Sequence, residues 1–78
     1  MEWRIEEKKL VKEFEFANFK RAVEFVNKIL PIAQDMNHHP DILIHSYKKV
    51  KIILFTHSEG KITEKDYNLS EKIDKLIN

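Results

Sequence analysis

A stripe of apolar residues at helical spacing occupies the middle of the chain and divides it into two β-rich halves. Its members recur every third or fourth position: Phe19, Ala22, Val23, Val26, Ile29, Leu30 and Ala33. This spacing predicts an amphipathic helix, and Asn18 is a suitable cap for its first turn. Pro31 removes a backbone donor at a cost of about 3 kcal/mol, yet the apolar spacing continues through Met36. We therefore predict a kinked helix over residues 18–36, with an end at Leu30 as the alternative.

Two short strands are predicted before this helix. Residues 3–6 alternate apolar and charged side chains, residues 7–9 form a predicted turn, and residues 10–16 resume the alternation. In the second strand Lys12 interrupts the apolar side, which is formed by Leu10, Phe14 and Phe16. We therefore expect this strand to lie partly at an edge of the sheet, with the aliphatic stem of Lys12 covering core atoms.

Two more strands and a second helix are predicted after it. Residues 42–47 and 50–57 are rich in β-forming residues, with a tight turn at Lys48 between them. Both faces of the second run are partly apolar, which is expected if one face packs on helices and a partner covers the other. Residues 63–66, Thr-Glu-Lys-Asp, form a near capping box that opens a helix with an apolar stripe at Leu69, Ile73 and Leu76. The order β-β-α-β-β-α predicts an α+β fold, a four-stranded antiparallel sheet with two helices on one face.

Size and charge limit the functions open to such a chain. The 78 residues are expected to form a single domain, 1–78, whose small core makes self-association a source of stability. Cysteine is absent, which excludes disulfides and thiolate metal sites. A net charge of +1 does not indicate a nucleic-acid binder, and a solvated turn explains the short basic run Lys48, Lys49 and Lys51. No apolar run reaches the length of a membrane span and no signal-peptide core follows Met1, so we expect a cytoplasmic protein without a membrane partner.

Three of the four histidines occupy positions that suggest chemistry. His38 and His39 precede Pro40, which holds His39 in an extended conformation, so the two side chains are expected to point in roughly opposite directions. One ring could then face a cleft while the other lines its wall, and two solvated surface histidines are the plain alternative. His57 stands at the predicted end of a strand, whereas His45, in mid-strand without a local motif, is interpreted as a solvated polar residue. Diverging rings, the lack of cysteine and the lack of an HExxH spacing argue against a metal site.

Two positioned imidazoles are what a dehydration requires. An imidazole titrates near neutral pH, so it can both accept and donate a proton there. One ring can protonate the departing hydroxyl while the other removes the proton whose electrons expel it, and each such group is worth about 10²–10⁴-fold in rate. This hypothesis requires that His57 meets His38 at one cleft.

A wider pattern surrounds these histidines. It comprises residues 37–42, Asn-His-His-Pro-Asp-Ile, then Tyr47, Val50, Thr56-His57, residues 63–66 and Leu69, and it reaches back through Phe14-Glu15-Phe16, Phe19, Ala22 and Phe25-Val26-Asn27 to Trp3. This arrangement resembles the signature of the pterin-4a-carbinolamine dehydratases over nearly the whole chain. Members of that family share the β-β-α-β-β-α fold, usually with an extra helix before the tryptophan, which we do not expect here.

The resemblance implies a reaction, the loss of water from 4a-hydroxytetrahydropterin to give quinonoid dihydropterin, which recycles a hydroxylase cofactor. It implies that His38 and His57 are the catalytic acid–base pair, without assigning acid and base, and that His39 binds and orients the pterin ring. Asp66 matches an aspartate of the family and is placed with His39 among the substrate-binding residues, with a helix cap as its structural alternative. No metal or organic cofactor is implied, because the pterin is the substrate, and a homodimer or homotetramer is expected.

Two other functions stay open at this point. Some relatives have a glutamate where this chain has Gln34, so a pterin of another pathway, for instance molybdenum-cofactor metabolism, is a second candidate ligand. Some animal relatives act as dimerisation coactivators of a homeodomain transcription factor, so an interaction module is the third hypothesis. Among the aromatic residues, Phe19 and Phe25 are interpreted as core, whereas Phe55 shares a strand face with His57 and could cover the pocket or belong to a subunit interface.

Overall fold

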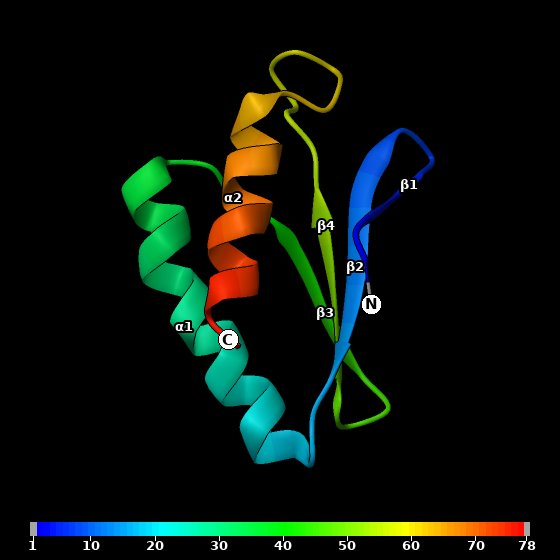
Figure 1. Cartoon of the computed structure of the whole chain (residues 1–78), viewed down its shortest axis with the longest axis vertical. Coiled ribbons are helices and arrows are strands. Elements are labelled where there is room, and N and C mark those ends of the chain that lie inside the picture. The colour runs from blue at the N-terminus through cyan, green and yellow to red at the C-terminus, as the bar shows by residue number, and fades with distance from the viewer. Residues whose placement is uncertain (1, 78) are drawn as a thin grey trace.

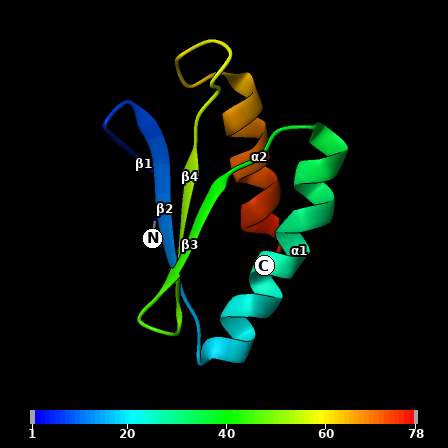
Figure 2. The ribbon, with the colours of Figure 1, turned by 180° about the vertical axis from the view of Figure 1, so that it is seen from behind.

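Four strands and two helices follow one another in the predicted order in the computed structural model, which describes residues 2–77. They are β1 (Arg4–Glu6), β2 (Lys9–Glu15), α1 (Phe19–Met36), β3 (Asp41–His45), β4 (Lys49–Leu54) and α2 (Glu64–Lys75). The strands form one antiparallel sheet in the order β1-β2-β4-β3. Both helices lie on the same side of this sheet, as the two opposite views in Figure 1 and Figure 2 show. The predicted fold class is therefore confirmed.

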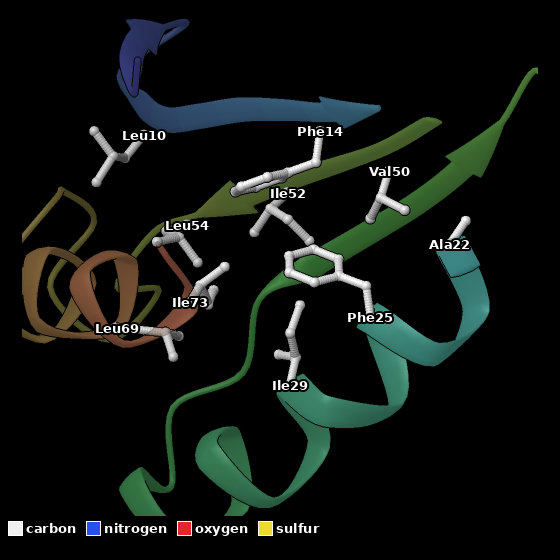
Figure 3. Packing of buried hydrophobic residues seen from close by; sticks show 10 residues of the cluster. All are labelled: Leu10, Phe14, Ala22, Phe25, Ile29, Val50, Ile52, Leu54, Leu69 and Ile73. Carbon is white, nitrogen blue, oxygen red and sulfur yellow. The ribbon is translucent and has the colours of Figure 1, made fainter. Parts of the chain in front are cut away.

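The apolar core fills the space between the sheet and the two helices (Figure 3). It consists of Leu10, Phe14, Ala22, Phe25, Ile29, Val50, Ile52, Leu54, Leu69 and Ile73. Because side chains alternate across a strand, β2 and β4 each give one face to this layer. The interpretation of Phe25 as core is confirmed, since its ring centroid lies 4.9 Å from that of Phe14. The same interpretation of Phe19 is wrong, because α1 reaches the core only from Ala22 onward and leaves the Phe19 side chain 56% exposed.

Helix α1 runs through Pro31 and ends at Met36, so the alternative end at Leu30 is wrong. At its start the side chain of Asn18 accepts a hydrogen bond from the backbone of Arg21 at 2.9 Å, as predicted for a cap. At its end Asn37 adopts the left-handed conformation, with φ 51° and ψ 42°. This residue turns the chain out of the helix immediately before the histidine pair. Among residues 2–77, neither helix is long and apolar enough to cross a bilayer.

The edge position predicted for Lys12 is confirmed. Strand β1 pairs with only the first three residues of β2, whereas β4 pairs along β2 as far as Glu15. The Lys12 side chain lies over the ring of Phe14, 4.9 Å from its centroid, and its Nζ contacts Asp74 Oδ1 at 2.9 Å. Lys12 therefore covers core atoms with its stem while α2 neutralises its charge.

The strand β3 is shorter than predicted. It ends at His45 rather than Tyr47, because Ser46 (φ 51°) and Tyr47 (φ 52°) adopt left-handed turn conformations that cannot continue a strand. The turn therefore covers residues 46–48 rather than Lys48 alone.

The strand β4 also ends early, at Leu54 rather than His57. Residues 57–60 form a turn in which the backbone N–H of Gly60 donates to the carbonyl of Thr56 at 2.9 Å. Thr56 continues the buried side of β4, which Val50, Ile52 and Leu54 form. His57 therefore lies on the turn that follows the strand, where its side chain is exposed.

Candidate functional site

A cleft of about 350 Å³ lies where the segment after α1 meets the segment after β4. Its lining includes His38 and His39 from the first segment, Phe55, Thr56 and His57 from the second, and Lys65 from the first turn of α2. The three histidines that the sequence singled out therefore border one hollow. Shared proton chemistry between His38 and His57 requires this arrangement.

His38 lies against the buried carboxylate of Asp66. Its backbone N–H donates to the carbonyl of Ala33 at 3.1 Å, which closes the end of α1 and fixes where the ring begins. The ring Nε2 lies 2.6 Å from Asp66 Oδ1, and the His38 side chain is 11% exposed whereas that of Asp66 is fully buried. Asp66 thus lies behind His38, and its side chain has no exposed surface, so its predicted place among the substrate-binding residues stays a prediction.

Two threonines hold the other oxygen of Asp66. Oδ2 accepts the backbone N–H of Thr63 at 3.0 Å and the hydroxyl of Thr56 at 2.8 Å. The two threonine hydroxyl oxygens are 2.7 Å apart, and Thr63 Oγ1 also accepts the backbone N–H of Lys65 at 3.3 Å. The predicted capping box is therefore confirmed, and one carboxylate serves both as helix cap and as partner of a cleft histidine.

His39 has a different partner. Its Nε2 lies 2.8 Å from Oε1 of Gln34, and both side chains are exposed. Pro40 restricts His39 to an extended conformation, which separates the two neighbouring rings. The two neighbouring rings therefore have separate partners, since His38 contacts a buried carboxylate of α2 and His39 contacts an exposed amide of α1.

The ring of His57 packs against Phe55. The two ring centroids are 5.3 Å apart and the planes are inclined by 74°, an edge-to-face arrangement. Phe55 itself is partly buried and lines the cleft, so of its two predicted roles the structure supports a place at the pocket. Lys9 lies over the same ring, 5.5 Å from its centroid. Phe55 therefore supplies an apolar wall beside a polar, exposed imidazole.

The fourth histidine lies away from the cleft, on the sheet face opposite the helices. The sequence suggested that His45 is a solvated polar residue. The structure corrects this, because its Nε2 lies 2.6 Å from Oε2 of Glu13. This hydrogen bond, aided by the positive charges of His45, Lys49 and Lys51, holds the pKa of the Glu13 carboxyl below its usual value, against an opposing effect of burial. Sequence reasoning missed the pair because the two residues are 32 positions apart and lie on different strands.

Two residues of the site had no role predicted from the sequence alone. In the sequence Thr56 appeared only in the Thr56-His57 part of the wider pattern, and Lys65 only in the first turn of a predicted helix, yet both line the cleft. Neither has a local signal, since each acquires its neighbours through the packing of α2 on the end of β4. Within residues 2–77, no three histidine, aspartate or glutamate side chains converge in a way that could hold a metal ion.

Comparisons with known proteins find relatives over nearly the whole chain. Residues 1–76 match the family described as Pterin 4 alpha carbinolamine dehydratase. A protein of Sulfolobus acidocaldarius is 53% identical over 74 residues, which are 95% of this chain and 80% of that protein. A protein of Prochlorococcus marinus is 47% identical over 76 residues, 97% of this chain and 79% of that protein. Both bear the provisional name pterin-4-alpha-carbinolamine dehydratase.

Solved structures show the same architecture. A transcriptional coactivator/pterin dehydratase from Brucella melitensis superposes with a TM-score of 0.90 at 27% identity, over 97% of this chain and 82% of that chain. A pterin dehydratase-like RuBisCO assembly factor of the alpha-carboxysome superposes with a TM-score of 0.80 at 22% identity, over 97% and 89% of the two chains. At that identity the second structure bears on the fold alone.

Proposed function

Because the chain belongs to the pterin-4a-carbinolamine dehydratase family, we propose that it removes water from a 4a-hydroxytetrahydropterin to give a quinonoid dihydropterin. The observation that carries the proposal is the meeting of His38, His39 and His57 around one cleft of about 350 Å³. A hollow of this size suits a small flat ligand such as a bicyclic pterin.

The proposed chemistry needs one proton removed and one delivered. A base takes the proton from N5 of the substrate, the electron pair of that bond forms the N5–C4a double bond, and the C4a–O bond breaks. An acid protonates the departing hydroxyl, which leaves as water. We assign these two tasks to His38 and His57, because both border the cleft and each imidazole can take or give a proton near neutral pH.

The remaining residues would position the ring. His39 would bind the pterin from the same segment as His38, with its own ring held by Gln34. Phe55 offers an apolar edge beside His57, and Lys65 brings a cation to the rim of the cleft. Asp66, which is fully buried, would act through His38 rather than by contact with the substrate.

Gln34 favours a second candidate, the binding of a different pterin without dehydration. The side chain facing His39 is a neutral amide, so it cannot supply the negative charge that a glutamate at this position would place beside the imidazole. If the reaction depends on that charge, the cleft would bind reduced pterins yet leave the dehydration rate unchanged.

Stopped-flow kinetics with chemically generated 4a-hydroxytetrahydropterin test the first proposal against the second. We expect the wild-type protein to accelerate the loss of water, and we expect His38→Ala and His57→Ala each to lower kcat by about 10²–10⁴-fold. His45→Ala is the matched control, because this histidine contacts Glu13 outside the cleft. The proposal fails if the folded wild type gives only the uncatalysed rate, or if neither cleft variant is slower than the control.

A further inference from the structure

We infer that His38 exchanges its proton with the substrate through Nδ1, and that Asp66 and Thr56 are positioning residues that impose this choice by keeping the ring hydrogen on Nε2. The inference rests on the proposed function for its kinetic consequence, whereas the position of the hydrogen can be measured without any substrate. It follows from counting donors and acceptors around one buried carboxylate.

One of the groups around the Asp66 carboxylate, a backbone N–H, can only donate. The backbone N–H of Thr63 points to Asp66 Oδ2 at 3.0 Å, so this oxygen accepts. Thr56 Oγ1 lies 2.8 Å from the same oxygen and donates its single hydroxyl hydrogen there. Its contact with Thr63 Oγ1 at 2.7 Å must therefore be a hydrogen bond that Thr63 donates, which leaves Thr63 Oγ1 free to accept the N–H of Lys65. Every hydroxyl in this chain of contacts then donates once.

The charge of Asp66 decides which atom donates in the contact between its Oδ1 and Nε2 of His38. An oxygen that accepts two hydrogen bonds at the positive end of a helix favours the ionised carboxylate. An ionised carboxylate has no hydrogen to give, so Oδ1 accepts, and the contact of 2.6 Å requires a hydrogen on Nε2 of His38.

A neutral imidazole carries only one ring hydrogen, so Nδ1 of His38 is left with its lone pair. Within residues 2–77, the only side-chain hydrogen bond of the His38 ring is the one that Nε2 makes to Asp66. Nδ1 is therefore the nitrogen that can take up a proton from a ligand, or return one after taking it up. This geometry resembles the way in which a carboxylate fixes the tautomer of a catalytic histidine in a hydrolase triad.

Replacement of Asp66 by asparagine tests the inference sharply. The same count of donors predicts that the ring hydrogen of His38 moves from Nε2 to Nδ1. Thr63 N–H still needs an acceptor, so the amide oxygen takes the place of Oδ2 and the amide nitrogen faces His38. Nε2 must then accept, and the ring hydrogen moves to Nδ1. In two-bond ¹H–¹⁵N spectra recorded where His38 is neutral, we expect a protonated Nε2 in the wild type and a protonated Nδ1 in Asp66→Asn.

The kinetic consequence separates positioning from folding. In folded Asp66→Asn we expect kcat to fall by about 10²–10⁴-fold, the loss typical of a misplaced acid or base, with a small change in KM. Asp74→Asn is the matched control, since Asp74 is also on α2 and bonds Trp3 and Lys12 instead of a histidine. It should leave the His38 nitrogens and kcat unchanged.

Substitutions of Thr56 give a milder test that leaves the carboxylate in place. Thr56→Val keeps the shape but removes one of the two hydrogen bonds that favour the ionised form of Asp66. Where Asp66 is protonated it can donate to Nε2, so we expect part of His38 to carry its hydrogen on Nδ1, with a lower kcat. Thr56→Ser restores the donor and should restore both the wild-type spectrum and the rate.

The outcomes distinguish this inference from the proposed function. A wild-type spectrum with the hydrogen on Nδ1 of His38 overturns the inference even if the protein is an active dehydratase. An inverted spectrum with full activity in Asp66→Asn also overturns it, because the reacting nitrogen would then not matter. A wild type without dehydratase activity refutes the proposed function, and the spectra still decide whether Asp66 sets the tautomer.

Discussion

The amide oxygen of Gln34 lies 2.8 Å from Nε2 of His39, so the last turn of α1 holds one of the cleft histidines in place. Gln34→Glu keeps the length of the side chain and adds a negative charge, which stabilises the protonated ring. Because exposed charge pairs are worth about 0.2–1 kcal/mol, we expect the midpoint of the His39 NMR titration to rise by about half a pH unit relative to wild type.

Gln34→Leu is the control for this change, because it removes the hydrogen bond without adding a charge. It should not raise the His39 midpoint. An unaltered midpoint in Gln34→Glu would show that the side chains do not meet in solution.

The core makes a second prediction, about the stability of the sheet and helix layers. Ile73 is fully buried on α2, and truncation to alanine leaves a cavity among neighbours that cannot fully collapse. We expect Ile73→Ala to lower the free energy of unfolding by about 2–5 kcal/mol in urea titrations. Ile5→Ala removes the same atoms from a side chain that is 63% exposed, and we expect a change of less than about 0.5 kcal/mol. Equal effects of the two variants would contradict the assignment of the core.

The Glu13–His45 pair predicts a dependence of stability on pH. Because the pKa of the Glu13 carboxyl is lowered in the folded chain, its contribution is present above the usual glutamate range and is lost as the pH falls through the folded value. Urea unfolding at about pH 5 and about pH 3, on either side of the usual glutamate pKa, measures this loss. Glu13→Gln lacks the titrating group, so we expect its stability to fall less than that of wild type between the two conditions. A larger fall in the variant would refute the sign of the effect.

Exposed apolar side chains predict self-association. Leu43 is 52% exposed on the sheet face opposite the helices, and Leu30 is 61% exposed on α1. Light scattering coupled to size exclusion should give the mass of a dimer or tetramer for the wild type. We expect Leu43→Glu or Leu30→Glu to lower that mass, depending on which face is covered, and a wild-type mass of one chain would contradict the prediction.

The repeating elements of the fold could be predicted because their side chains follow a strict period. Helical spacing predicted the extent of α1 through Pro31, and the alternation of apolar and charged residues predicted β1 and β2. The ends of β3 could not be predicted, because Ser46 and Tyr47 adopt left-handed conformations that their side chains do not favour. A turn of this kind depends on the pairing of the strands around it rather than on its own residues.

The histidines of the site could be proposed from the sequence, whereas their partners could not. Asp66 lies 28 positions from His38, and the packing of α2 beside the end of α1 brings the two together. The capping box did predict where the Asp66 carboxylate would be, at the helix start, without indicating that its second oxygen faces an imidazole. Contacts of this kind carry no local pattern, so they belong to tertiary structure.

The proposed dehydration requires that one cleft holds a reduced pterin between His38 and His57. Intermolecular nuclear Overhauser effects from bound 7,8-dihydropterin, a stable stand-in for the reaction product, measure this most directly. We predict contacts from the pterin to the ring protons of both histidines. Saturable binding with contacts to only one of the two rings, or no binding at all, would contradict it.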